Sequence, residues 1–183
     1  MSRFKFLLEG IKNFREVGTV TRSGKALSLK MSSFLTSEDK FVLEVGAGDG
    51  ALTREILNKM HPDGKLLSFE INPNMYKTLS QISDPRLIPI NDSAENLESY
   101  MAEYGIDIFD GIISAIPYIV LPESLALLIL NLCKKNLKKG KSYTQVHYAK
   151  SLTSLYKGVF GNISTHFVFF NIPPAYAFRC LKE

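Results

Sequence analysis

A glycine-rich loop that directly follows an apolar run constrains the fold of this chain more than any other feature. Residues 40–51 read KFVLEVGAGDGA, in which an apolar stretch leads into three alternating glycines. Glycine lets the backbone adopt unusual φ and ψ values and approach a ligand closely, and the N–H groups of the helix that follows point into the crevice. The loop therefore predicts a ligand site at the carboxyl end of a strand in an open α/β sheet.

Strand-like and helix-like segments alternate along most of the chain. The strand-like runs cover residues 40–46, 65–71, 86–91, 109–117 and 142–149, and helical patterns cover residues 23–35, 51–60, 72–82, 93–105 and 122–137. We expect Ser23 and Asn72 to cap two of these helices and Gly140 to close the last one. The alternation favours a mostly parallel α/β sheet with helices on both faces. Residues 164–171 and 175–181 are β-rich runs without a helix between them, and they predict an antiparallel C-terminal strand pair at the sheet edge.

Size, charge and cysteine content limit the kind of protein. The 183 residues suit one compact domain, which we divide into an N-terminal helical segment at 1–36 and a main domain at 37–183. We expect no signal peptide, and no apolar run reaches the ~18–20 residues that span a bilayer. The two cysteines lack the spacing of a metal site and favour a cytoplasmic compartment. A net charge of +4 permits an anionic partner, either a nucleic-acid backbone or anionic lipid.

The N-terminal residues carry an amphipathic helical pattern. The apolar residues that share one face are Phe4, Leu7, Leu8, Ile11 and Phe14, and Arg and Lys residues flank them. Such a helix can lie in a membrane interface, where each Lys or Arg near an anionic leaflet contributes on the order of 1 kcal/mol. The same face would also serve to pack the helix on the domain. Both interpretations stay open, and they are compatible if the helix moves.

Two ligands compete for the glycine loop. The loop satisfies the dinucleotide fingerprint G-x-G-x-x-A, and Glu70 lies where a carboxylate would hold the ribose hydroxyl groups of either ligand. Three features favour S-adenosylmethionine (SAM). Glu44 precedes the first glycine and can support the loop and the methionine end, Asp92 follows the third strand and would face an adenine amino group, and the chain leaves no second domain for a dehydrogenase substrate. We therefore predict SAM as the ligand.

Taken together, these residues resemble the signature of the class I SAM-dependent methyltransferases. That signature is E-x-G-x-G-x-G after the first strand, an acid after the second, an acid after the third and a motif after the fourth, which here is SAIPY at 114–118. The resemblance implies a Rossmann-like fold with a seven-stranded sheet whose final strand is reversed. It also implies a SAM site whose residues are Glu44, Gly46, Ala47, Gly48, Gly50, Glu70, Ile71, Asp92, Ser93 and Ser114.

The methyl acceptor is indicated by segments far from the glycine loop. Enzymes that methylate base amines often carry Asn or Asp after the fourth strand, whereas this chain has Ser114. The segments SAIPYIVLPES, YTQVHYA and NIPPAYAFR are similar to those of the bacterial phospholipid N-methyltransferases, which methylate phosphatidylethanolamine. This resemblance implies a phospholipid or related lipid amine as substrate, and peripheral contact with the anionic inner face of the cytoplasmic membrane. A more distant resemblance to the ribosomal RNA adenine dimethyltransferases makes nucleic acid a weaker alternative.

Our candidates for the acceptor side are Ser114, Pro117, Tyr118 and Tyr148. The two tyrosine rings would hold an increasingly methylated, cationic nitrogen by cation–π contact, and they would serve equally well as core aromatics. We assign no general base, and we expect His147 on the fifth strand to be structural. The competing hypotheses are an RNA adenine N-methyltransferase and a SAM-binding protein without transferase activity, and the oligomeric state is left open.

Overall fold

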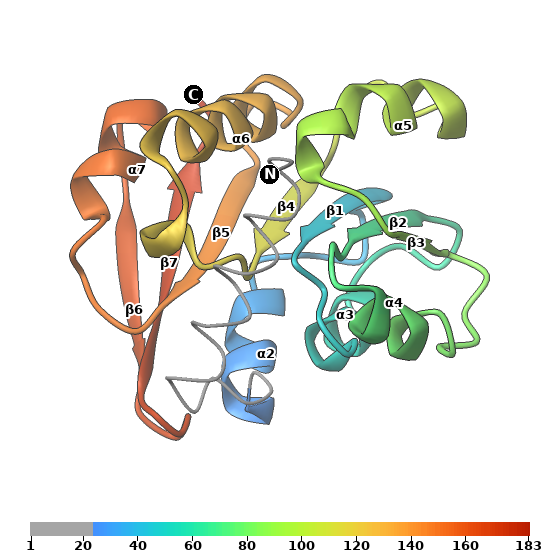
Figure 1. Cartoon of the computed structure of the whole chain (residues 1–183), viewed down its shortest axis with the longest axis horizontal. Helices are drawn as coiled ribbons and strands as arrows, with labels where there is room; N and C mark the ends of the chain where they lie inside the picture. Colours follow the sequence, from blue (N-terminus) through green and yellow to red (C-terminus); the bar gives the residue numbers. More distant parts are fainter. Residues whose placement is uncertain (1–23) are drawn as a thin grey trace.

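The computed structural model describes residues 24–183, whose strands form one mixed sheet (Figure 1). The strands are β1 (Phe41–Val45), β2 (Lys65–Phe69), β3 (Leu87–Ile90), β4 (Gly111–Ser114), β5 (Ser142–His147), β6 (Ser164–Val168) and β7 (Ala175–Leu181). Their order across the sheet is β3-β2-β1-β4-β5-β7-β6. The first five strands are parallel to one another, whereas β7 is antiparallel to both β5 and β6. The predicted seven-stranded sheet with an antiparallel C-terminal pair is confirmed.

Helices cover both faces of this sheet. They are α2 (Lys25–Ser32), α3 (Ala51–Leu57), α4 (Pro73–Leu79), α5 (Leu97–Tyr104), α6 (Glu123–Lys135) and α7 (Thr153–Phe160), with short 3-10 turns at Ala94–Asn96 and Tyr118–Val120. In Figure 1, α5, α6 and α7 lie above the sheet, and α2, α3 and α4 lie below it. Asn72 begins α4 as predicted, because its side-chain oxygen accepts the N–H groups of Asn74 and Met75. No helix within residues 24–183 is long and apolar enough to cross a bilayer.

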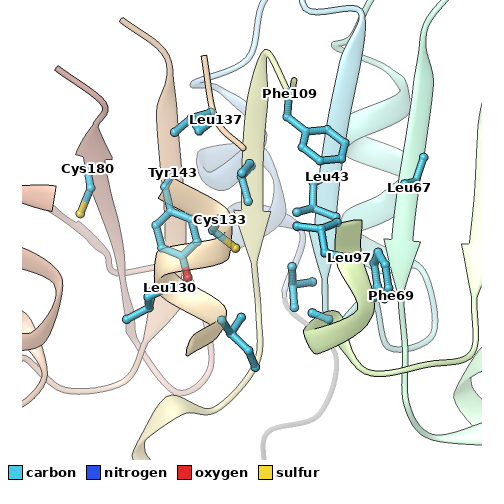
Figure 2. Packing of buried hydrophobic residues seen from close by; sticks show 14 of the residues in the cluster. Leu43, Leu67, Phe69, Leu97, Phe109, Leu130, Cys133, Leu137, Tyr143 and Cys180 are labelled. Atoms are coloured by element: carbon cyan, nitrogen blue, oxygen red, sulfur yellow. The ribbon is translucent and has the colours of Figure 1, made fainter. Parts of the chain in front are cut away.

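The hydrophobic core lies in two layers, one on each side of the sheet. Neighbouring residues of β1 enter different layers, since successive side chains of a strand point to opposite faces. Leu43 packs in the layer under α5, α6 and α7, and Val42 packs in the layer over α2, α3 and α4. Figure 2 shows the first layer, where strand and helix residues interdigitate, among them Leu43, Leu67, Phe69, Leu97, Leu130, Cys133 and Tyr143. This burial on both faces explains why the strands read as continuous apolar runs.

Helix α2 shares the core of the main domain. Leu27 and Met31 are buried in the second layer together with Ala175 and Ala177 of β7. The amphipathic pattern at the N-terminus and the predicted cap Ser23 lie outside the described residues. The division of the chain at residue 36 stays a prediction.

Two local features differ from the sequence expectation. Helix α7, between β5 and β6, is absent from the helices expected from the sequence, although Leu152, Leu155, Tyr156, Val159 and Phe160 recur at helical spacing and pack in or against the first core layer. This amphipathic spacing is a sequence signal for the helix, and burial of its apolar face offsets the low helix propensity of Gly158. Helix α6 ends before Gly140, and the carbonyl of its C-cap residue Asn136 accepts the Phe109 N–H (2.8 Å) near the start of β4.

Candidate functional site

An open cleft lies at the carboxyl ends of the parallel strands, where the strand order reverses between β1 and β4. It encloses about 490 Å³ of empty space, its open mouth included. The lining comes from the strand ends, the segments that follow them and α6: Val45, Gly46, Phe69, Glu70, Ile71, Asp92, Ser93, Ala94, Ala115, Ile116, Pro117, Leu121 and Ile129. The structure therefore brings together predicted residues that come from four different strand ends.

The glycine loop is fixed to the end of β2 by its own N–H groups. The N–H groups of Gly46 and Ala47 donate to the Phe69 carbonyl (2.8 and 3.0 Å), and the Gly48 N–H donates to Glu70 Oε2 (2.7 Å). These three loop donors are used inside the protein, whereas the sequence expectation concerned the N–H groups at the start of the helix that follows, α3. The shape of the loop is consequently set by β2 before any ligand arrives.

Two loop glycines are required by the backbone itself. Gly46 has a φ of +82°, and a Cβ at this position would lie 2.7 Å from Ile116 Cγ2 and 3.1 Å from Ile116 N. Gly50 has a φ of +86°, and a Cβ there would collide with the Ile82 side chain. Residues with a Cβ rarely adopt this left-handed conformation. The motif thus lets the loop after β1 and the segment after β4 meet at the floor of the cleft.

Glu44 is fully buried in β1, directly before the loop. Its Oε2 accepts hydrogen bonds from Thr53 Oγ1 and Ser68 Oγ (2.7 Å each), while Oε1 has no hydrogen-bond partner among the described residues. Burial raises the pKa of Glu44 to about 7, against the opposite effect of the two hydroxyl donors. Glu44 does not line the cleft, so it supports the loop from below and keeps one buried acceptor unsatisfied.

Glu70 follows β2 and lines the cleft while being nearly buried. One carboxylate oxygen accepts the Gly48 N–H, and the other accepts the Asn72 N–H (2.8 Å) at the start of α4. These bonds fix both oxygens at the cleft wall. This is the position that the sequence predicts for a carboxylate that faces ribose hydroxyl groups.

Asp92 lines the cleft after β3 and is held by three donors. Its Oδ2 accepts from Asn96 Nδ2 (2.9 Å) and Tyr100 Oη (3.1 Å), and its Oδ1 accepts the Ser93 N–H (2.7 Å). Burial, together with the hydrogen bond to Asp92, raises the pKa of Tyr100, so its phenol stays protonated and donates. The carboxylate is therefore kept in one orientation at the edge of the cleft.

The segment after β4 supplies an apolar wall. Ala115, Ile116 and Pro117 line the cleft, and the Ile116 carbonyl accepts a hydrogen bond from Gln145 Nε2 (2.9 Å). Gln145 is fully buried in β5, and its Oε1 accepts from Tyr143 Oη (2.8 Å). The neighbouring strand consequently positions this wall, a role that the sequence did not reveal for Gln145.

Three residues predicted for the acceptor side lie away from the cleft lining. Ser114 and Tyr118 are 0% and 2% exposed, and the hydroxyl oxygens of Tyr118 and Tyr143 lie at hydrogen-bonding distance (3.2 Å). Burial holds the pKa of Tyr118 well above its usual range. Tyr148 follows β5 and packs against the second core layer, and burial raises its pKa. Contacts of these residues with an acceptor stay a prediction, whereas Pro117 lines the cleft.

His147 has the surroundings of a structural residue. Its Nε2 is hydrogen-bonded to Tyr156 Oη (2.7 Å), and its ring packs on Phe178 at a centroid distance of 4.9 Å. Burial lowers the pKa of His147 to about 4, which keeps the ring neutral near pH 7. The expected structural role agrees with this arrangement.

Sequence reasoning missed two groups of residues. Phe69, Leu121 and Ile129 line the cleft, but no motif distinguishes them from other apolar residues. Thr53 and Ser68 hold Glu44 in place. A signal was present for Ser68, because a hydroxyl group inside the apolar run KLLSF needs a buried partner.

The residues present fit SAM. Gly46 allows close approach of the backbone, and Glu70 and Asp92 present fixed carboxylates from two neighbouring strands. No Lys or Arg is among the residues that line the cleft within the described part of the chain. The cleft is therefore electrostatically favourable for a ligand that carries an ammonium and a sulfonium group.

Curated proteins of two kinds are similar in sequence to this chain. No protein-family model matches the chain. The chain is 23% identical over 181 residues to the ornithine lipid N-methyltransferase of Singulisphaera acidiphila. The matched region covers 97% of this chain and 94% of that relative. It is also 32% identical over 75 residues to the ribosomal RNA small subunit methyltransferase H of Christiangramia forsetii, but that match covers 41% of this chain and 24% of the relative.

Solved methyltransferase structures share the fold. The N-methyltransferase NodS from Bradyrhizobium japonicum WM9 superimposes with a TM-score of 0.70 at 12% identity, over 86% of this chain and 93% of that one. The T. thermophilus 16S rRNA N2 G1207 methyltransferase, in complex with AdoMet and guanosine, superimposes with a TM-score of 0.66 at 17% identity, over 90% of this chain and 44% of that one. The chain has the Rossmann-like class I methyltransferase fold, and the predictions of a methyltransferase and of SAM as its methyl donor agree with these similarities.

Proposed function

We propose that this chain is a SAM-dependent N-methyltransferase that acts on the amine head group of a membrane lipid. The observation that carries the proposal is the end-to-end similarity to an ornithine lipid N-methyltransferase, which spans 97% of this chain. The candidate acceptors are an ornithine lipid and phosphatidylethanolamine, which both present a primary amine. The protein would act as a peripheral enzyme at the inner face of the cytoplasmic membrane.

The cleft residues would divide the work of binding and orientation. SAM supplies an electrophilic methyl group on a sulfonium sulfur. Glu70 and Asp92, each fixed by hydrogen bonds of known geometry, would hold the ribose and the adenine. Gly46 and the wall at Ile116 would place the methionine end at the cleft floor. Because methyl transfer requires in-line approach of a lone pair, such positioning supplies much of the rate.

The charge of the cleft favours SAM but does not select between the acceptors. Its charged lining residues are the acids Glu70 and Asp92, and both would be occupied by the ribose and the adenine of SAM. The choice of a lipid amine therefore rests on the sequence similarity. The amine must lose a proton before it attacks the methyl group, and we assign no residue of the chain as the base that takes this proton.

Methylation of ribosomal RNA is the second candidate function. The partial match to a ribosomal RNA methyltransferase and the net charge of +4 favour it. Ser114 stands where the adenine dimethyltransferases carry Asn, and it is buried. A SAM-binding protein that transfers no methyl group is the third hypothesis.

One labelling experiment distinguishes these functions. The full chain is incubated with methyl-labelled SAM and, in separate reactions, with anionic vesicles that contain phosphatidylethanolamine, with vesicles that contain ornithine lipid, or with ribosomal RNA. We expect label in a lipid fraction and none in RNA. Label in RNA alone would replace the proposal with the second function, and intact SAM binding without label in any fraction would leave the third. The variant Gly46→Ala serves as the control for dependence on the cleft.

A further inference from the structure

The tip of the β6–β7 hairpin exposes a group of large apolar side chains. We define the hairpin tip as residues 167–172, in which the exposed fractions are 56% for Phe167, 69% for Phe169, 85% for Phe170 and 89% for Ile172. The rings of Phe169 and Phe170 pack edge to face at a centroid distance of 5.5 Å. Scattered apolar residues are normal on a protein surface, whereas a contiguous group of this kind marks an interaction site.

The hairpin tip lies at the same edge of the sheet as the cleft. β7 is antiparallel to β5, and β6 is antiparallel to β7, so β6 ends at the edge where β5 ends. That edge carries the cleft, because the cleft lies at the carboxyl ends of the parallel strands. In Figure 1 the hairpin extends beyond the rest of the sheet, beside α2.

The exposed tip is built into the fold by a buried amide. Asn171 is 2% exposed, its Oδ1 accepts the Gly24 N–H (2.9 Å), and its Nδ2 donates to the Pro173 carbonyl (2.6 Å). These bonds tie the tip to the start of α2. The neighbouring side chains of Phe170 and Ile172 are thereby directed to solvent although the backbone between them is anchored.

The charge around the hairpin complements an anionic surface. The hairpin itself, residues 164–181, contains one Arg and no Asp or Glu. Beside the hairpin, Lys150 lies over the Tyr176 ring (5.2 Å), and Lys30 and Arg179 lie over the Phe34 ring (4.8 and 5.0 Å). Apolar side chains flanked by cations are the combination that binds an anionic membrane interface.

We propose that the hairpin tip is a membrane-docking element that inserts Phe169, Phe170 and Ile172 into the interface of an anionic phospholipid bilayer. Insertion at this edge would bring the mouth of the cleft to the depth of the lipid head groups. The functional role of this docking, which is to bring the cleft to its lipid substrate, rests on the proposed lipid acceptor. Binding of the hairpin tip to a bilayer requires neither SAM nor methyl transfer. The two proposals can therefore fail separately.

A single-tryptophan reporter tests the insertion directly, because the chain contains no Trp. The variant Phe170→Trp places the reporter on the tip, and the control Ile108→Trp places it at a 38% exposed site just before β4, at the opposite edge of the sheet. With vesicles of phosphatidylethanolamine and phosphatidylglycerol, we expect a blue shift and quenching by brominated lipid for Phe170→Trp and neither for Ile108→Trp. Unchanged emission of Phe170→Trp on vesicles that sediment with the protein would overturn the proposal.

The double variant Phe169→Ser/Phe170→Ser tests how much binding depends on the tip. We expect vesicle co-sedimentation to weaken on the order of 10-fold, while SAM binding without lipid and methylation of a water-dispersed short-chain phosphatidylethanolamine stay unchanged. If no lipid amine is methylated but the tip still inserts, the proposed function fails and the docking element stands. Undiminished vesicle binding would overturn the docking element. The proposal would also be overturned if the wild type is a dimer, the double variant is a monomer and both bind vesicles equally. The tip would then bind a second copy of the chain.

Discussion

The glycine loop and the β6–β7 hairpin tip lie at the same edge of the sheet, yet they are built in opposite ways. Around the loop, polar groups are buried and paired: the Gly48 N–H with Glu70, and Glu44 Oε2 with two hydroxyl groups. On the tip, Phe169, Phe170 and Ile172 are apolar and exposed. Hydrogen bonds fix both regions, since the buried Asn171 side chain bonds to Gly24 and Pro173 beside the tip.

The difference shows how one sheet edge can serve two kinds of ligand. A small polar ligand needs preformed acceptors that do not reorganise on binding. A membrane interface needs apolar surface that is exposed in the free protein. Substitutions at the loop should therefore alter stability and SAM binding, whereas substitutions at the tip should alter vesicle binding alone.

The largest expected effect follows from Glu44. Its pKa is about 7 in the folded protein, above the ordinary value of 4.5, so the folded state holds the proton more tightly. The contribution of Glu44 to the free energy of unfolding is therefore fully present below pH 4.5. This contribution, about 3 kcal/mol, is lost as the pH rises through 7. Glu44→Gln should abolish this dependence, and urea unfolding from pH 4 to 8 measures it.

The difference in the free energy of unfolding between Glu44→Gln and the wild type should change sign between about pH 4 and pH 8. At pH 8 we expect Glu44→Gln to be more stable than the wild type by about 2 kcal/mol, because a neutral amide is buried at less cost than a carboxylate. At pH 4 its NH2 group, which has no acceptor in place of the unpaired Oε1, should cost about 1 kcal/mol. Parallel stability curves for the two proteins across this pH range would contradict the buried, pKa-shifted carboxyl group.

A smaller effect is expected at the floor of the cleft. Gly46→Ala should lower the free energy of unfolding by about 2 kcal/mol through left-handed strain, and the clash with Ile116 should weaken SAM binding by at least ~10-fold. Isothermal titration with SAM measures the binding. Gly105→Ala is the matched control, because its φ of +64° imposes similar strain but its Cβ would meet nothing within 4 Å. Equal SAM affinities in the two variants would show that the contact between loop and wall is unimportant.

The hydrogen bond from Tyr100 to Asp92 should have a moderate effect. Tyr100→Phe removes a donor at 3.1 Å, which should cost about 1 kcal/mol or roughly 5-fold in SAM affinity, since the carboxylate becomes less well oriented. Tyr104→Phe on the same helix should leave the affinity unchanged. A comparable loss in both variants would attribute the effect to α5 in general.

The smallest effect on stability is expected at the tip. Phe170→Ser should change the free energy of unfolding by less than about 0.5 kcal/mol, because the side chain is 85% exposed. The contrasting variant Phe178→Ala, at a fully buried position of β7, should cost about 3–5 kcal/mol. Thermal unfolding of both variants measures the difference, and a large loss for Phe170→Ser would mean that the tip packs within the protein.

Much of the fold and of the ligand site could be predicted from the sequence, because both rest on local rules. Continuous apolar runs that alternate with helical patterns identified the parallel strands. Asn72 caps α4, as its residue type predicts. Helix α7 could also have been predicted, because Leu152, Leu155, Tyr156, Val159 and Phe160 recur at helical spacing, and burial of this face stabilises it despite Gly158. Tyr118 illustrates the same limit, since the motif SAIPY places it next to the cleft along the chain while the fold buries its ring in the core.

The sequence by itself determined that a glycine loop follows the first strand and that acids follow the second and third strands. These are short-range properties, set by backbone conformation and by the period of the apolar residues. Only the tertiary structure decided that Glu44 would be buried with one unpaired oxygen, that Gln145 would hold the wall at Ile116, and that the tip would stand exposed. Burial and partnership depend on which distant segments meet, as they do where β7, the last strand of the chain, lies between β5 and β6.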